Sequence, residues 1–192
     1  MYTATNDATY QTAFNLGLDY IFQGQYPNGG WPQRYPSGNG YHRHITFNDN
    51  AMVRLMEFVR QVATDEGYAF VDAARRTAAA DAFDRGITCI LQCQIEVDDQ
   101  LTAWCAQHDE IEFSLRPARS YELASLSGSE SVGIARLLMS IDDPSPEIVQ
   151  AVEGAVAWFV QAKLTGIRVV EEQDEEGPDG LNRVVVVDAQ AP

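Results

Sequence analysis

The stretch from Leu101 to Glu110 holds the densest set of side chains that could do chemistry. Trp104, Gln107, His108 and Asp109 supply an aromatic ring, an amide, an imidazole and a carboxylate. A histidine beside an aspartate suggests a nucleophilic triad. However, adjacent residues rarely face each other in that way, and no serine lies in a nucleophile-elbow motif. The stretch is better explained as a polar wall of a binding site.

Two arginines, Arg116 and Arg119, follow shortly and precede a predicted helix. A guanidinium can bind a carboxylate through two parallel hydrogen bonds, so these arginines suit an acidic ligand. The alternative is a structural ion pair with Glu122 in the same segment. In a third interpretation, Asp49, Asp109 and Glu122 supply the paired carboxylates of a glycoside hydrolase.

The segment Asn48-Asp49-Asn50 offers hard oxygen ligands, which suit Ca²⁺. Capping of the following helix by Asn48 or Asp49 explains the same residue types equally well. The preceding basic cluster, Tyr41-His-Arg-His44, could attract an anionic ligand to an otherwise acidic chain.

The segment from Tyr26 to Gln33 contains Gly29, Gly30 and Trp31 between two prolines. Tight glycine turns let a sugar approach the backbone, and the face of a tryptophan stacks on the CH groups of a pyranose. The alternative is a turn whose tryptophan belongs to the core.

An internal repeat organises these segments. Phe14, Gly17, Ile21 and Gln25 recur in register at Phe83, Gly86, Ile90 and Gln94, and a weaker copy starts at Ala151. The apolar residues of each copy have helical spacing, and each copy is followed by a polar or extended stretch at 26–35, 95–104 or 166–171. The repeat predicts helices arranged in pairs, with loops that converge at one end.

Further amphipathic helices are predicted between the copies. One covers 51–62, with Met52, Leu55, Met56 and Val59 on one face. The other covers 131–141, with Val132, Ala135, Leu138 and Met139 on one face. Ser127 and Glu130 have capping-box spacing, and Ser145 is placed to cap the last helix. The β-branched runs at 167–172 and 182–188 predict a hairpin, with a turn-rich acidic loop over 173–180 between them.

The net charge of −15 makes a nucleic-acid partner unexpected, because such a surface repels phosphates. An acidic polysaccharide would need a local basic patch or a bridging cation. No apolar run approaches the roughly 18 residues of a membrane helix, and Met1 to Thr5 do not start a signal peptide. The three cysteines, Cys89, Cys93 and Cys105, are expected to be small buried apolar residues.

Taken together and in this order, the motifs resemble the pectate lyases of polysaccharide lyase family 10. The segments that carry the resemblance are Gln25-Tyr-Pro-Asn-Gly-Gly-Trp-Pro-Gln33, Ile45-Thr-Phe-Asn-Asp49 with Ala51-Met52, Leu101-Thr-Ala-Trp-Cys-Ala-Gln-His-Asp109-Glu110, Pro117-Ala-Arg119, Ser125-Leu-Ser-Gly128 with Glu130-Ser131, Lys163 with Gly166-Ile167, and Asn182-Arg183-Val-Val-Val. The resemblance covers essentially the whole chain.

The resemblance implies a mainly α fold, an (α/α)3-type barrel or toroid of helix pairs with short β-hairpins in the loops. It also implies calcium-assisted anti-β-elimination of polygalacturonate or oligogalacturonides, in which Ca²⁺ binds the uronate carboxylate and an arginine removes the C5 proton. The catalytic arginine falls on Arg119, and an aspartate that contacts the metal or the substrate falls on Asp49, which we expect to be a metal ligand. The remaining site residues implied to bind substrate are Trp31, Asn48, Gln107, His108, Asp109, Arg116 and Tyr121.

We expect one catalytic domain over residues 1–192, shorter than the usual family domain at both ends. The family's domain usually starts with an Asp-Asn-x-Ala-Thr segment and continues to a later substrate-binding arginine, and we expect both to be missing from this chain. A secreted monomer with no membrane partner is expected. The alternatives are a non-catalytic pectate-binding or uronate-binding remnant of the same fold and, less favoured, a glycoside hydrolase.

Overall fold

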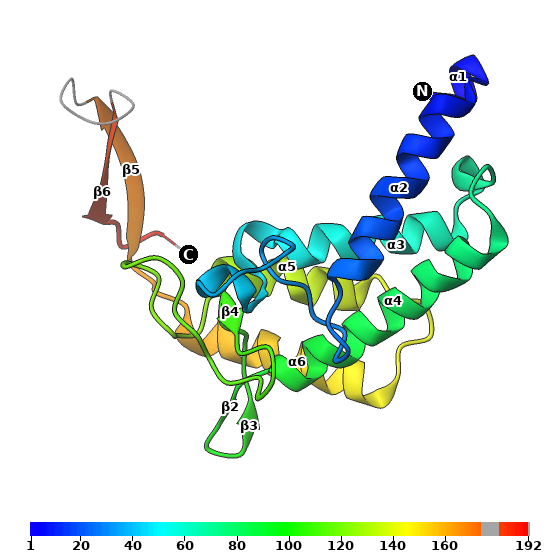
Figure 1. Ribbon diagram of the computed structural model, residues 1–192. Coiled ribbons are helices and arrows are strands. Elements are labelled where there is room, and N and C mark those ends of the chain that lie inside the picture. The colour runs from blue at the N-terminus through cyan, green and yellow to red at the C-terminus, as the bar shows by residue number, and fades with distance from the viewer. Residues whose placement is uncertain (174–180, 192) are drawn as a thin grey trace. The chain divides into compact units, whose positions relative to one another are not determined.

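The computed structural model describes residues 1–173 and 181–191 (Figure 1). Contacts between residues divide the chain into two compact units, Met1–Ala157 and Trp158–Pro192. The single domain expected over residues 1–192 stays a prediction. The acidic loop expected over 173–180 lies outside the described residues from position 174 onward.

The mainly helical class with short β-hairpins is confirmed. Among the described residues the helices are α1 (Tyr2–Thr5), α2 (Ala8–Gly24), α3 (Ala51–Thr64), α4 (Ala73–Cys93), α5 (Gly128–Met139) and α6 (Pro146–Ala162), with short 3-10 turns η1 (Tyr41–Arg43), η2 (Asn48–Asn50) and η3 (Glu66–Tyr68). The strands form three antiparallel pairs: β1 (Ile45–Thr46) with β4 (Gln107–His108), β2 (Glu96–Val97) with β3 (Gln100–Leu101), and β5 (Ile167–Gln173) with β6 (Leu181–Val187).

The predicted repeat is visible in side-chain hydrogen bonds. Gln25 caps the end of α2, and its amide donates to the carbonyls of Gly29 (2.9 Å) and Ala82 (2.8 Å). Gln94 caps the end of α4, and its amide donates to the carbonyls of Thr102 and Ala151, both at 2.8 Å. Each glutamine thus ties one copy to its own loop and to the helix of the next copy.

The tryptophans that follow the two glutamines repeat a second contact. The indole N–H of Trp31 donates to the carbonyl of Ile21 at 3.0 Å, and that of Trp104 donates to the carbonyl of Ile90 at 2.8 Å. Ile21 and Ile90 are the matching isoleucines of the two helices. The loop after each helix is therefore fastened at its entrance by a glutamine and at its exit by an indole.

The core of the first unit lies between α2, α3 and α4. Leu18 packs with Val59, Val62, Val71 and Ala79, and partly buried phenylalanines surround them. Helix α3 packs along α4 (Figure 1). A Cβ at Gly86 would lie only 2.8 Å from the Cε of Met56, so the repeated glycine of α4 permits this close packing.

The helix ends fit the predictions only in part. Ser145 Oγ accepts from the amide of Ile148 at 3.4 Å, as expected. Helix α3 instead begins after Asn50, which has a φ of 58° and makes no side-chain capping bond, so neither Asn48 nor Asp49 caps it. Ser127 precedes α5, but its hydroxyl bonds the Glu130 carboxylate and not a backbone amide.

The buried face of α5 differs from the predicted one. Ile134, Ala135, Leu137 and Leu138 are buried, whereas Val132 and Met139 are 44% and 67% exposed. The expected face of α3 is correct at Met52, Met56 and Val59, all fully buried. The apolar spacing in α5 was ambiguous because Val132 to Met139 carries apolar residues on nearly every side.

The remaining sequence expectations concern the tail and the cysteines. Strands β5 and β6 pair antiparallel, with Ile167 opposite Val187, so the hairpin is confirmed. Cys89, Cys93 and Cys105 are buried and form no disulfide. Within residues 1–173 and 181–191, no helix is long and apolar enough to cross a membrane.

Candidate active site

A short two-stranded sheet joins the two loop regions that the sequence singled out. In β1 and β4, Ile45 lies opposite His108 and Thr46 opposite Gln107. The amides of Phe47 and Asn48 both donate to the carbonyl of Ala106, at 2.8 and 3.0 Å. Segments that are far apart in the sequence therefore meet at one junction.

The arginine-bearing loop is fastened to the same junction. The amide of Arg116 donates to the carbonyl of Gln107 at 3.0 Å, and the amide of Ser127 donates to that of Trp104 at 2.8 Å. Residues 117–126 between these two bonds form a loop that carries Arg119 and ends at α5. The junction of β1 and β4 thus positions both Asn48-Asp49 and Arg119.

Arg119 is held mainly by Glu122. The Arg119 Nε donates to Oε2 of Glu122 at 2.8 Å, Nη2 donates to Oε1, and the backbone amide of Arg119 donates to Oε2 at 3.0 Å. The guanidinium carbon lies 5.2 Å from the centroid of the Tyr121 ring, which is 72% exposed. The side chain of Arg119 remains 45% exposed, against 17% for Glu122.

The ion pair shifts both groups strongly. Hydrogen bonding to Glu122 raises the pKa of Arg119 above its ordinary value, and the nearby charges of Glu122, Tyr121 and Asp49 act in the same direction. Hydrogen bonding from Arg119 likewise lowers the pKa of Glu122 to about 2, against the opposing effect of burial. In the free protein, therefore, Arg119 is a firmly held cation and Glu122 an anion.

Asn48 and Asp49 approach this pair from the other loop. The Asn48 amide reaches Oε1 of Glu122 at 3.5 Å, a long contact, and Asp49 lies close enough to Arg119 to influence its pKa. Asp49 is exposed, and Asp49 and Asn50 both adopt left-handed backbone conformations, with φ of 55° and 58°. Asp98 and Asp99, in the turn between β2 and β3, have similar φ values, and aspartate and asparagine adopt this conformation more readily than most residues.

Arg116 forms a second ion pair, with Asp109. Its Nε and Nη2 lie 2.9 and 2.7 Å from Oδ2 of Asp109. Burial alone would raise the pKa of Asp109. The backbone amides of Glu112 and Ile111 and the Arg116 guanidinium outweigh burial and lower that pKa to about 2. Asp109 consequently holds its own loop and Arg116 in place.

A third arginine–carboxylate pair was not anticipated from the sequence. Glu110 accepts from Nδ1 of His44 and contacts Nε of Arg43, both at 2.8 Å. Ligand atoms of His44, Asp109 and Glu110 lie within 4.8 Å of one another, as in a metal site. Only the register of β1 and β4, which places His44 next to Asp109, could have revealed this group.

Three of the predicted substrate-binding residues are core residues in this structure. Trp31 is 2% exposed, and Gln107 and His108 are fully buried. His108 accepts from the amide of Cys105 at Nε2 (3.1 Å) and donates from Nδ1 to the carbonyl of Phe113 (2.8 Å). Burial lowers the pKa of His108, so this ring is neutral and both of its nitrogens bond within the protein.

Trp31, Gln107 and His108 thus offer almost no accessible surface in this structure, and their part in substrate binding stays a prediction. The Trp31 ring has no exposed face on which a sugar could stack, because its indole anchors the loop to α2. Arg116, Tyr121 and Arg119 remain accessible. Asn48 and Asp109 are 5% and 6% exposed.

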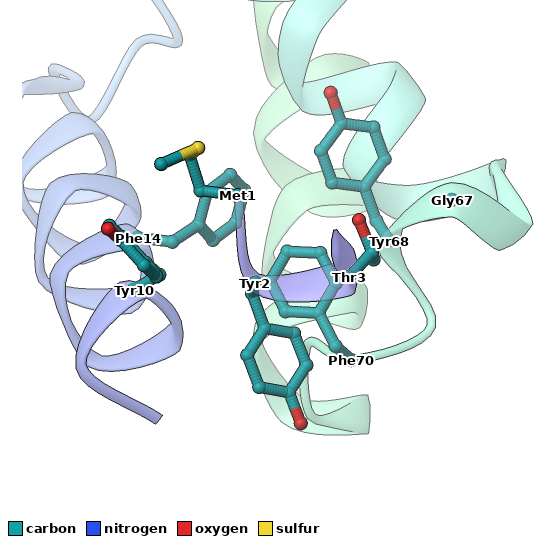
Figure 2. A pocket seen from close by; sticks show the side chains of 8 residues that line it. All are labelled: Met1, Tyr2, Thr3, Tyr10, Phe14, Gly67, Tyr68 and Phe70. Atoms are coloured by element: carbon teal, nitrogen blue, oxygen red, sulfur yellow. The ribbon is translucent and has the colours of Figure 1, made fainter. Parts of the chain in front are cut away.

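A separate pocket lies at the N-terminal end of the chain (Figure 2). It has a volume of about 440 Å³ and is lined by Met1, Tyr2, Thr3, Tyr10, Phe14, Gly67, Tyr68 and Phe70. Tyr2 and Phe14 each lie 5.1 Å from the Phe70 ring, centroid to centroid. Its lining contains no arginine, lysine or histidine, so it is poorly suited to a uronate.

Comparisons with known proteins agree with the architecture. The pattern of the pectic acid lyase family matches residues 1–192. Two solved structures of a family 10 polysaccharide lyase from Cellvibrio cellulosa, one a mutant in complex with trigalacturonic acid, are each 32% identical in sequence with TM-scores of 0.82. No curated protein matched the sequence.

The alignment with these structures covers 99% of this chain, but only 59% and 58% of theirs. The chain thus spans about three fifths of the length of the solved structures that it resembles. Their similarity supports the α/α-type fold that the sequence led us to expect.

Proposed function

Because this chain belongs to the pectic acid lyase family, we propose that it is a polysaccharide lyase that cleaves polygalacturonate by β-elimination, with Arg119 as the base. The arrangement around Arg119 is the observation that carries this proposal. An arginine that is 45% exposed, oriented by a carboxylate and accompanied by an exposed aspartate suits the chemistry of a uronate.

The proposed base must lose a proton before it can accept one. In the free protein Glu122 opposes this loss by raising the pKa of Arg119. A positive charge close to the bound substrate would act in the opposite direction and favour the neutral guanidine. Arg116 and Arg43 are less able to supply it, because Asp109 and Glu110 already neutralise them.

Calcium is the cation that fits best, and Asp49 is the residue that would hold it. Its carboxylate is exposed, makes no ion pair among the described residues, and lies near Arg119. Carboxylate oxygens are preferred ligands of Ca²⁺. When bound, the ion would polarise the uronate carboxylate as a Lewis acid.

The group of His44, Asp109 and Glu110 fits calcium less well, although its ligand atoms lie close together. Imidazole nitrogen is not a preferred calcium ligand. In addition, Arg43 and Arg116 already contact the two carboxylates at 2.7 to 2.9 Å. We therefore assign this group a structural role.

Substrate binding is proposed for the accessible side chains around Arg119. The exposed ring of Tyr121 offers a face to a pyranose, and the 41% exposed guanidinium of Arg116 offers hydrogen-bond donors to a second uronate. Asn48 would act through its contact with Glu122. The polymer is proposed from the bound trigalacturonic acid of the related lyase.

A glycoside hydrolase is less compatible with this site. Such an enzyme needs one carboxyl group that stays protonated near neutral pH, with a raised pKa. The pKa values of Asp109 and Glu122 are instead both lowered to about 2. Neither group can act as the general acid while its arginine remains in place.

The deciding experiment follows the ultraviolet absorbance of unsaturated product from polygalacturonate, with Ca²⁺ and with a chelator. We expect elimination that requires Ca²⁺ and falls by roughly a thousandfold in Arg119→Ala, because the base is lost. Arg119→Lys should also fail, since lysine lacks the planar fork. Asp49→Ala should raise the Ca²⁺ concentration required.

Other outcomes would point elsewhere. Binding of polygalacturonate without any absorbance change would leave a non-catalytic pectate-binding protein. New reducing ends without unsaturation would indicate hydrolysis. Full activity of Arg119→Ala would remove Arg119 as the base.

A further inference from the structure

We propose that Glu122 is the positioning residue of Arg119, and that it determines which guanidinium nitrogen faces the substrate. This inference rests on the proposed function of Arg119 as the base. It assigns a role to a carboxylate that would otherwise only oppose the loss of a proton.

The hydrogen bonds of Arg119 occupy one edge of its guanidinium. Nε and Nη2 both donate to the Glu122 carboxylate, and the backbone amide of Arg119 donates to the same group. Nη1 donates to no partner within residues 1–173 and 181–191. The free edge of a half-exposed arginine is thus the one that carries Nη1.

Backbone bonds make this arrangement rigid. The amide of Glu122 donates to the carbonyl of Arg119 at 2.8 Å, and the amide of Ala118 donates to the carbonyl of Glu122 at 3.0 Å. The guanidinium carbon lies over the Tyr121 ring, 5.2 Å from the ring centroid. From the other loop, the Asn48 amide contacts Oε1 of Glu122 at 3.5 Å, the oxygen that also accepts from Nη2 of Arg119.

These contacts select the neutral form of the guanidine. Loss of the Nε proton would remove one hydrogen bond to Glu122, and loss of an Nη2 proton would weaken the other, because an imine is a poorer donor. Loss from Nη1 leaves both bonds intact. Glu122 therefore directs the lone pair to Nη1, as the aspartate of a catalytic triad fixes the tautomer of its histidine.

The resulting step is balanced. Nη1 takes the proton from C5 of the uronate, the C–H electron pair forms the C4–C5 double bond, and the C4–O bond breaks. Arg119 becomes a guanidinium that is again paired with Glu122. The sugar oxygen leaves with the bonding electrons and takes a proton from water.

The test compares Glu122→Gln and Glu122→Asp with the unmodified protein on polygalacturonate. Glu122→Gln removes the charge and places an amide N–H₂ against the donors of Arg119. We expect kcat to fall by roughly a hundredfold or more with little change in KM, because orientation matters mainly in the transition state. Glu122→Asp keeps the charge but is one methylene shorter, so its kcat should lie between that of Glu122→Gln and that of the unmodified protein.

A matched control removes the carboxylate of another arginine pair. Asp72 bonds Arg75 three residues later, as Arg119 bonds Glu122, and also caps α4. Asp72→Asn keeps capping ability, so kcat and KM should be unchanged. Circular dichroism and thermal unfolding establish that each variant is folded.

The outcomes separate this inference from the proposed function. An active unmodified protein with unchanged kcat in Glu122→Gln, or an effect on KM alone, would overturn the role of Glu122 only. Absence of elimination by the unmodified protein would overturn the proposed function, and this inference with it. If Glu122→Gln does not fold, the kcat and KM of Glu122→Asp decide by the same criteria.

Discussion

Three arginines of the loops each bond a carboxylate of the same chain: Arg43 with Glu110, Arg116 with Asp109 and Arg119 with Glu122. The protein has a net charge of −15, so these three arginines supply positive charge only in their immediate surroundings. Asp109 has the most buried carboxylate of the three, at 8% exposure, and depends most on its partners.

We predict that Asp109 stabilises the protein above the acid range. Its pKa is about 2 in the folded state, below the ordinary value of 3.8. A lowered pKa contributes stability that is complete above the unfolded value and lost as the pH falls from about 4 towards about 2. Asp109→Asn should cost roughly 2 kcal/mol at about pH 7 and flatten the loss of stability in acid.

Urea unfolding at several pH values measures this effect. The matched control is Glu112→Gln, which removes a carboxylate from an exposed residue of the same loop. Equal stability of Asp109→Asn and the unmodified protein at neutral pH would contradict the prediction.

At the scale of elements, the two repeated glutamines, Gln25 and Gln94, join each helix to its loop and to the next copy of the repeat. Gln94 joins the end of α4 to its loop at Thr102 and to α6 at Ala151. Gln25 does the same between α2, Gly29 and α4. These bonds connect successive copies of the repeat.

We predict that Gln94→Met destabilises the first unit by roughly 1–3 kcal/mol, because two carbonyls lose their donor while the side-chain volume is kept. Chemical denaturation gives the free energy of unfolding. Gln92→Met is the control, since Gln92 is exposed and on the same helix. Similar losses in both variants would show that the bonds of Gln94 contribute nothing specific.

The elements also show what the sequence could and could not predict. Helical spacing located α2, α3, α4 and α6, because apolar periodicity reports burial directly. The short pairing of β1 with β4 left no periodic signal, since each strand has only two residues. Gln107 and His108 are both fully buried in this pairing, and the sequence indicated neither their burial nor that of Trp31.

For the candidate site, the sequence indicated which residue types are present but not which side chains surround each of them. The arginine–carboxylate alternative for Arg119 and Glu122 followed from their spacing, and the structure contains that pair. The contact of Arg43 and His44 with Glu110 depends on tertiary structure, so the sequence could not indicate it.

For the whole molecule, the dominant property is its negative charge. With 28 acidic and 13 basic residues, the protein repels a polyanion at long range. The loops that carry Arg43, Arg116 and Arg119, here called the arginine loops, attract it only at short range. Added salt should weaken the repulsion more than the short contacts.

We therefore predict that moderate NaCl lowers KM for polygalacturonate, contrary to the usual behaviour of proteins that bind polyanions. Initial rates from about 20 to about 200 mM NaCl, at constant free Ca²⁺, measure this effect. Highly methyl-esterified pectin serves as the nearly neutral control, and its KM should hardly change. A KM for polygalacturonate that rises with salt would mean that the arginine loops dominate.

The fastening of each loop by a glutamine at its entrance and an indole at its exit has a consequence for protein engineering. The two loops have unequal lengths, Gln25 to Trp31 and Gln94 to Trp104, yet end on equivalent anchors. The scaffold therefore tolerates different inserts between constant attachment points, much as an antibody framework carries its variable loops. Loop exchange between members of the family, with the glutamine and the tryptophan retained, offers a route to new loops on the same scaffold.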